Sequence, residues 1–175
     1  MSKNSQPRLE NIQMLILDVD GVLTDGTIIV NADGTESKSF SALDGHGIRL
    51  WKRSGLKVAF LSGRKSEPTV HRARQLEVDY VLEDCHDKLK TLKNLLEKLS
   101  LAPEEIAYIG DDWPDLPVIK YVGFGVATAN AAEEVKQHAD YITTSKGGNG
   151  AIRETVEYIL KNNNKWQQLV ERYTL

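Results

Sequence analysis

Short apolar runs that suit buried strands recur along this chain, with helical patterns between them. The clearest helical pattern spans Lys88 to Leu99, where leucines at three- and four-residue spacing form one apolar face. Regular alternation of strand and helix is typical of parallel βαβ units with right-handed crossovers. We therefore predict an α/β fold built on a doubly wound, mainly parallel sheet, with strands at Met14–Val19, Lys57–Leu61, Asp79–Leu82, Ile106–Ile109 and Phe124–Ala127.

The size and charge of the chain limit what it can be. It has 175 residues, of which 41% are hydrophobic, so we expect a single domain over residues 1–175. A net charge of −3 with scattered cations predicts no nucleic-acid partner. No apolar run is long enough to cross a bilayer, and the polar start Met1–Pro7 lacks the apolar segment of a signal peptide. We expect no membrane association and a cytoplasmic location.

Two segments fall outside the strand and helix alternation. Residues 26–40 follow the first strand and read as a β-hairpin, with turn residues between a β-branched arm and a polar arm. An isolated hairpin is marginal in water, so we expect it to pack on the body or on another subunit as a flap beside the first strand. The C-terminal tail, residues 161–175, carries apolar residues at helical spacing and could dock on its own domain or on a neighbouring subunit.

The first strand ends in two carboxylates, Asp18 and Asp20, followed by Gly21. Because side chains alternate along a strand, the two acids would share a face, where they repel unless a cation lies between them. Hard oxygen ligands at the carboxyl end of a strand indicate Mg²⁺ at the edge where open α/β sheets bind ligands. The alternative is that the two acids only cap the following turn.

Polar residues follow three other predicted strands, and the same rule places all four groups at one edge of the sheet. A carboxylate cluster, a hydroxyl with backbone amides and a lysine together suit phosphoryl transfer. In that reading Asp18 attacks phosphorus, and Asp20 protonates the leaving oxygen and then activates water. The groups are Asp18 with Asp20; Ser62 with Gly63 and Arg64; Lys88; and Asp111 with Asp112 and Asp115.

Each group also has a structural interpretation. Ser62-Gly63-Arg64 is a common loop before a helix, and Asp111, Asp112 and Asp115 could be helix caps. Lys88 at a helix start opposes the helix dipole, which favours an anion partner over a solvated surface lysine. Asp111 is our candidate for the third metal ligand, with Asp115 holding a coordinated water or Lys88.

A glycine-rich loop, residues 147–150, leads into a predicted helix that carries Arg153 in its first turn. Its backbone amides could form an anion cradle at the helix N-terminus. An ordinary glycine-rich connection is the stronger interpretation.

Taken in order, these motifs resemble the haloacid dehalogenase superfamily, whose fold is Rossmann-like. Within it the chain is similar to the small branch of 3-deoxy-D-manno-octulosonate (KDO) 8-phosphate phosphatases, which lack a large cap domain. The resemblance runs from about Met14 to Leu160 and is carried by residues 18–26, 44–48, 62–65, 87–88, 110–115 and 147–154.

The resemblance implies a Mg²⁺-dependent phosphatase of an acidic sugar phosphate that supplies lipopolysaccharide synthesis as a homotetramer, with neighbouring hairpins and C-terminal segments closing each site. It makes Asp18 the nucleophile and Asp20 the acid/base. The metal would be held by Asp18, the backbone carbonyl of Asp20 and Asp111. The substrate would be bound by Ser62, Gly63, Arg64, Lys88 and Arg153. Of these, Ser62 and Lys88 would hold the phosphate, Arg64 would contact the substrate, with its carboxylate as the candidate group, and Arg153 would assist from the glycine-rich loop.

Two departures from the family pattern bear on the substrate. Glu83-Asp84 replaces a common Gln-Gly pair and adds negative charge near the site, and Trp113 replaces a smaller aliphatic residue as packing or as a substrate wall. A nine-carbon acidic sugar 9-phosphate is therefore an alternative substrate. A receiver-like signalling domain, which stores an aspartyl phosphate, is an alternative of a different class.

Overall fold

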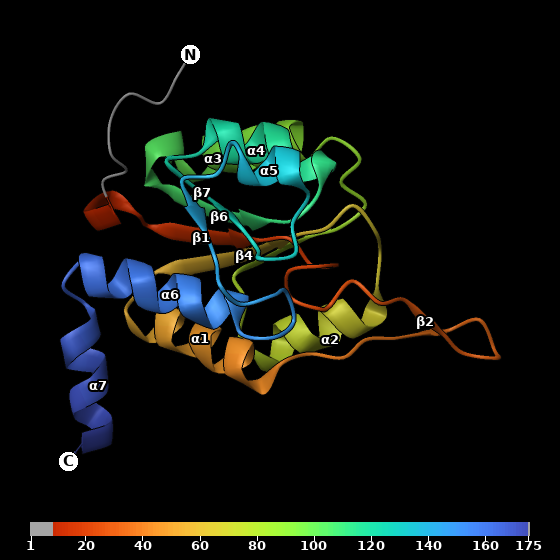
Figure 1. Cartoon of the computed structure of the whole chain (residues 1–175), viewed down its shortest axis with the longest axis horizontal. Coiled ribbons are helices and arrows are strands. Elements are labelled where there is room, and N and C mark those ends of the chain that lie inside the picture. Colours follow the sequence, from red (N-terminus) through yellow and green to blue (C-terminus); the bar gives the residue numbers. More distant parts are fainter. Residues whose placement is uncertain (1–8, 175) are drawn as a thin grey trace.

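A six-stranded parallel sheet forms the centre of the computed structural model, which describes residues 9–174 (Figure 1). The strand order is β5-β4-β1-β6-β7-β8, with β1 in the middle as a doubly wound sheet requires. The predicted α/β class is confirmed. The strands are β1 Met14–Leu17, β4 Lys57–Leu61, β5 Tyr80–Leu82, β6 Ile106–Gly110, β7 Phe124–Ala127 and β8 Tyr141–Ile142.

Helices cover both faces of the sheet, α1, α2 and α6 on one side and α3, α4 and α5 on the other (Figure 1). Side chains along β1 alternate between the two faces of the sheet. Leu15 and Leu17 pack toward α1, α2 and α6, while Met14 and Ile16 pack toward α3, α4 and α5. The helices are α1 Ala42–Arg53, α2 Glu67–Gln75, α3 Lys88–Leu99, α4 Leu116–Tyr121, α5 Glu133–Lys136, α6 Ala151–Asn162 and α7 Trp166–Thr174, with short 3₁₀ turns at Leu9–Asn11, Pro103–Glu105 and Trp113–Asp115.

Five strands and α3 lie where the apolar patterns predict them. Helix α3 has the predicted bounds because Asp87 caps its first turn, accepting a hydrogen bond from Lys90 N at 2.9 Å, and Ser100 ends it in the left-handed region at φ 54°. Strand β8 was not predicted. It has two residues at the sheet edge, Tyr141 and Ile142, too few to show a periodic pattern.

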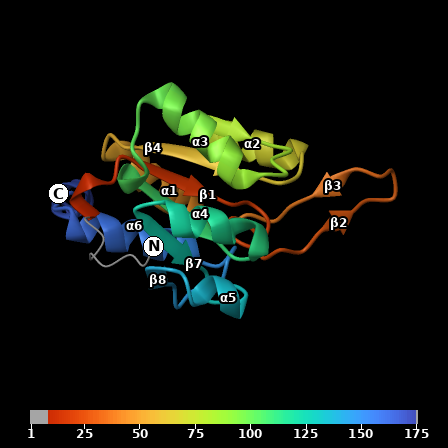
Figure 2. The ribbon, with the colours of Figure 1, turned by 90° about the horizontal axis from the view of Figure 1, so that it is seen from above.

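The predicted hairpin is present and projects from the body (Figures 1 and 2). Its ladder is short, pairing β2 Ile29–Val30 with β3 Glu36–Ser37 in antiparallel register. The β-branched arm is solvent-exposed, with Ile28, Ile29 and Val30 between 44% and 66% accessible. A two-stranded ribbon with an exposed apolar arm gains little stability of its own. The stability of the hairpin therefore depends on the contacts of its polar arm with the body.

The C-terminal helix α7 docks on its own domain. Trp166 and Leu169 pack against the core layer of α1 and α6, and the Tyr173 hydroxyl accepts a hydrogen bond from Arg53. Contact with a neighbouring subunit stays a prediction. No helix within residues 9–174 is long and apolar enough to cross a membrane. The polar start Met1–Pro7, predicted not to be a signal peptide, lies outside the described residues.

Candidate active site

The candidate site lies at the carboxyl ends of β4, β1 and β6, three neighbouring strands at the centre of the sheet. Asp18, Ser62 and Asp111 each follow directly on one of these strands. The Asp18 amide donates to the carbonyl of Ile109 at 3.0 Å, so the chain stays beside β6 as far as the first acid. The parallel topology therefore brings together side chains that are far apart in the sequence.

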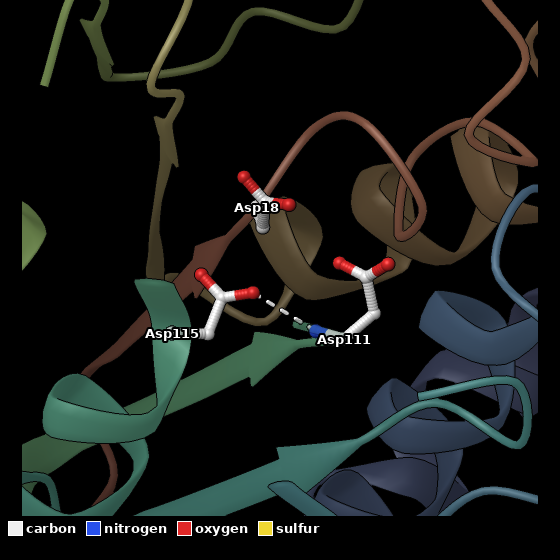
Figure 3. Close-up of side chains that lie close together, drawn as sticks. All are labelled: Asp18, Asp111 and Asp115. Carbon is white, nitrogen blue, oxygen red and sulfur yellow. Dashed lines mark hydrogen bonds between the residues drawn. The ribbon is translucent and has the colours of Figure 1, made fainter. Parts of the chain in front are cut away.

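Three carboxylates cluster there, from Asp18, Asp111 and Asp115 (Figure 3). One oxygen atom from each lies within 4.8 Å of the others. Lys88, the first residue of α3, reaches this cluster, and its Nζ lies 2.7 Å from Asp18 Oδ1 and 2.6 Å from Asp115 Oδ1. The buried ammonium partly offsets the charge of the three acids. The position of Lys88 at a helix start predicted an anion partner, and the carboxylates are that partner.

Asp115 has no free bonding capacity for an ion. Its Oδ1 also accepts from the Tyr108 hydroxyl at 2.6 Å, and its Oδ2 accepts from the amides of Asp111 and Asp112 at 2.9 and 3.2 Å. Asp115 therefore positions Lys88 and the loop after β6, while Asp112 contributes its backbone. Sequence reasoning missed Tyr108, whose only signal is a phenol in an otherwise aliphatic strand.

The two other acids keep free oxygen atoms and unfavourable charges. Burial raises the pKa of Asp18 well above its usual value, and the charge of Asp115 adds to this effect. Burial and Asp115 likewise raise the pKa of Asp111 to about 7. Asp111 Oδ1 is buried and has no hydrogen-bond partner among residues 9–174. An orphaned carboxylate oxygen beside a second buried carboxylate fits a hard cation held by Asp18 and Asp111.

The structure does not group the Asp20 carboxylate with this cluster, contrary to the expectation that Asp18 and Asp20 face one shared cation. Alternation does not apply because β1 ends at Leu17 and the chain then turns, with Gly21 at φ 99°. The Asp20 carboxylate instead forms an ion pair with Lys38 from the hairpin.

Ser62 and Gly63 lie at the end of β4, as predicted. The Ser62 side chain is buried, and its Oγ accepts a hydrogen bond from the Arg64 amide at 3.2 Å, which fixes the turn. The Arg64 side chain turns to the hairpin, where it pairs with Glu36, and its buried Nη1 has no hydrogen-bond partner in the described part of the chain. Arg64 thus has unused donor capacity beside the site.

The glycine-rich loop is not an open anion cradle. The buried Asp44 carboxylate of α1 already occupies the N-terminus of α6, accepting from the amides of Gly150 and Arg153 at 3.0 Å each. The Arg153 side chain bonds Glu157 Oε1 at 2.6 Å on the same helix. The structure therefore does not bring Arg153 into contact with the carboxylate cluster.

Close approach of α1 to two neighbouring helices explains the glycines that follow Asp44. A Cβ on Gly47 would lie 2.9 Å from the Arg153 Cα of α6, and one on Gly45 would lie 2.4 Å from the Arg72 guanidinium of α2. The Asp44-Gly-His-Gly motif therefore packs α1 against α6 and α2 and supports the loop beside the site. It supplies no group to the cluster.

The two departures from the family pattern have different surroundings. Glu83 accepts from the Ser66 amide at 2.8 Å, so it caps the start of α2. Asp84 lies between Lys65 and His86, at 3.2 and 3.4 Å. Lys65 offsets the charge of Asp84, whereas Glu83 is bonded to a backbone amide and keeps its charge. Trp113 is 60% exposed and is not a packing residue.

Comparison with known proteins gives consistent matches. Residues 79–154 match the haloacid dehalogenase-like hydrolases. The chain is 44% identical over 153 residues to the 3-deoxy-D-manno-octulosonate 8-phosphate phosphatase KdsC of Escherichia coli K12, covering 87% of this chain and 81% of that protein. KdsC of Salmonella typhi is 42% identical over 160 residues, covering 91% and 85%.

Two solved structures match nearly the whole chain. A probable YrbI family phosphatase from Pseudomonas syringae superposes with a TM-score of 0.95 at 43% identity, covering 99% of both chains. The 3-deoxy-D-manno-octulosonate 8-phosphate phosphatase of Moraxella catarrhalis, solved with magnesium, phosphate and KDO, superposes with a TM-score of 0.92 at 41% identity, covering 94% of this chain and 95% of that one.

Proposed function

This chain belongs to the 3-deoxy-D-manno-octulosonate 8-phosphate phosphatases, within the haloacid dehalogenase-like hydrolases, and we propose that it hydrolyses KDO 8-phosphate to KDO and phosphate with Mg²⁺. The observation that carries the proposal is the cluster of Asp18, Asp111 and Asp115, in which the buried Lys88 ammonium pairs with Asp18 and Asp115. It combines a nucleophile, a cation site and a fixed positive charge at one edge of the sheet.

The first half of the reaction transfers the phosphoryl group to the protein. One Asp18 oxygen is held by Lys88, which leaves the other to attack phosphorus. The new bond joins Asp18 Oδ to phosphorus, and the bond from phosphorus to the sugar oxygen breaks. The sugar oxygen keeps that electron pair and takes a proton from the Asp20 carboxyl, so KDO leaves as a neutral alcohol at that position.

The second half regenerates the protein. A water oxygen attacks the phosphorus of the aspartyl phosphate while the Asp20 carboxylate takes one of the water's protons. The bond from phosphorus to Asp18 breaks, and the Asp18 carboxylate keeps the electron pair. Asp20 ends protonated, as it began.

Asp18, Asp111 and the Asp20 backbone carbonyl would hold Mg²⁺, with the free Asp111 Oδ1 as the supporting feature. The bound ion supplies charge stabilisation for the phosphoryl oxygens. Ser62 and Lys88 would hold the phosphate, and Arg64 would meet the sugar carboxylate through its unpartnered Nη1. A role for Arg153 would require it to leave Glu157.

The proposal extends to assembly and context. A homotetramer in which hairpins meet neighbouring subunits would cover Ile28, Ile29 and Val30, the exposed apolar arm. Size-exclusion chromatography with light scattering measures the molar mass and tests this. A monomer at micromolar protein concentration would contradict it. Supply of lipopolysaccharide synthesis rests on the resemblance to the family, and a cytoplasmic location stays an expectation from the sequence pattern.

A substrate panel tests the function. Phosphate release is measured with Mg²⁺ on KDO 8-phosphate, a nine-carbon acidic sugar 9-phosphate and glucose 6-phosphate, and kcat/KM is compared. We expect KDO 8-phosphate to rank first. A higher kcat/KM for the nine-carbon ester would transfer the proposal to the alternative substrate, and equal values for all three would remove acidic-sugar specificity. The receiver-like alternative is set aside, because the relatives matched over most of the chain are phosphatases.

A further inference from the structure

The polar arm of the hairpin meets the body through two ion pairs. Glu36 pairs with Arg64, and Lys38 pairs with Asp20. Glu36 lies in β3 and Lys38 follows it two residues later, so extended backbone directs both side chains to the same side. The hairpin therefore carries one acid and one base that are complementary to two predicted site residues.

Lys38 is buried to a degree unusual for a lysine on a projecting ribbon. Its side chain is 3% exposed, against 75% for Lys65 and 26% for Lys52, which also form ion pairs. An ammonium taken out of water is costly unless a carboxylate faces it closely. Asp20 is its one ion-pair partner among residues 9–174.

Asp20 depends on Lys38 for its side-chain position. Its carboxylate is outside the Asp18, Asp111 and Asp115 cluster, and within the described part of the chain its one hydrogen bond is to Lys38. The preceding strand has ended at Leu17 and Gly21 turns the backbone at φ 99°, so the alternation of a strand does not set the direction of the Asp20 side chain. Proton transfer to an ester oxygen requires this carboxyl group within hydrogen-bond reach.

We propose that Lys38 is a positioning residue that holds the Asp20 carboxyl group for protonation of the leaving sugar oxygen. This rests on the proposed function, because it assigns a task within the same reaction. The proton moves from Asp20 Oδ to the sugar oxygen, and Lys38 keeps its own three protons and forms no covalent bond. The Glu36–Arg64 pair beside it holds the arm in register.

The leaving group separates this role from a structural one. An alkyl oxygen leaves poorly unless it is protonated, whereas p-nitrophenolate leaves without a proton. Loss of Asp20 positioning should therefore lower kcat/KM for the sugar ester far more than for p-nitrophenyl phosphate. The ratio kcat/KM is the appropriate constant, because it excludes the later hydrolysis of the aspartyl phosphate, which both esters share.

The test compares wild type, Lys38→Met, Lys38→Arg and the control Lys52→Met, whose Nζ pairs with Asp79 Oδ1 at 2.6 Å. For Lys38→Met we expect kcat/KM to fall about 10- to 100-fold on KDO 8-phosphate and less than about threefold on p-nitrophenyl phosphate. Lys38→Arg should restore most of the loss, and Lys52→Met should match wild type on both esters. An equal fall on both esters with Lys38→Met overturns the proposal.

A double variant keeps the test decisive if Lys38→Met also loosens the hairpin. In an Asp20→Asn background, Lys38→Met should cause no further loss on KDO 8-phosphate, because the group it positions no longer carries a proton to donate. Independent, multiplicative losses would overturn the proposal. Wild type that hydrolyses p-nitrophenyl phosphate but not KDO 8-phosphate would instead show that the proposed substrate is wrong.

Discussion

The carboxylate cluster and the hairpin are both parts of the candidate site, yet they are built in opposite ways. Asp18, Lys88 and Asp115 are each less than 10% exposed and are held by bonds from several elements of the core. The hairpin has two-residue strands, an exposed apolar arm and two ion pairs with the body. In the proposed reaction the groups that make and break the bonds to phosphorus are in the core, whereas Glu36 and Lys38, which face Arg64 and Asp20, are on a ribbon outside it.

The same difference governs how each region responds to substitution. A change in the cluster leaves a buried charge without a partner, which affects both stability and chemistry. A change in the hairpin affects local order and leaves the core intact. The four predictions that follow run from the largest expected effect to the smallest.

Asp18→Asn should reduce phosphate release by about 10⁴-fold or more, because the amide cannot replace the carboxylate as nucleophile. The fold should persist, since asparagine has nearly the same shape as aspartate, keeps an oxygen that can accept from Lys88, and leaves Lys88 its ion pair with Asp115. Phosphate release and near-ultraviolet circular dichroism check both parts. Turnover within tenfold of wild type would remove the nucleophile assignment.

Lys88→Met should lower the free energy of unfolding by about 3–5 kcal/mol, because Asp18 and Asp115 lose their shared buried cation. The matched change in a more exposed ion pair, Lys52→Met, should cost about 0–1 kcal/mol. Urea unfolding at neutral pH measures both. Equal losses would show that the cluster is no more dependent on its cation than the surface is.

Chelation should destabilise the protein in a pH-dependent way. Burial and Asp115 raise the pKa of Asp111 to about 7, above its unfolded value, so in the metal-free protein stability falls as pH rises from about 4 through 7. Mg²⁺ at 100 times its Kd should restore about 2.7 kcal/mol. The rise in Tm on replacing EDTA with a fixed concentration of Mg²⁺ should be larger at pH 8 than at pH 6. A pH-independent rise would contradict this.

Gly34→Ala should have the smallest effect. Gly34 has φ 83° at the hairpin tip with no atom within 4 Å of an added Cβ, so the penalty is about 1–2 kcal/mol of local backbone strain. We expect an unchanged Tm and a higher KM. Gly147→Ala is the contrast, because its Cβ would lie 1.7 Å from the Gly21 carbonyl oxygen, which requires backbone movement beside the site. Gly147→Ala should lower Tm. Equal Tm values for Gly34→Ala and Gly147→Ala would contradict the difference between the two regions.

Several parts of the site could be predicted because they depend on the topology alone. Residues that follow parallel strands meet at one edge, so Asp18, Ser62 and Asp111 could be placed near each other from the strand pattern. Lys88 could be added because a lysine at a helix start is unfavourable without an anion. The position of the Asp20 carboxylate could not be foreseen, since its partner Lys38 comes from the hairpin and is chosen by side-chain direction. The Arg153–Glu157 pair could have been foreseen, because the two residues are four apart on one predicted helix.

The sequence by itself determined the α/β class, five strands of the sheet, helix α3, the hairpin and the edge where the acids gather, because these follow from hydrophobic periodicity and chain order. Only the tertiary structure decided which hydrogen-bond or ion-pair partner each acid has. Asp115 is saturated by Lys88, Tyr108 and two amides, Asp111 keeps a free oxygen, and Asp20 turns to Lys38. The reason is physical: each buried polar atom must find a partner, and which partner lies within about 3 Å depends on packing between distant segments.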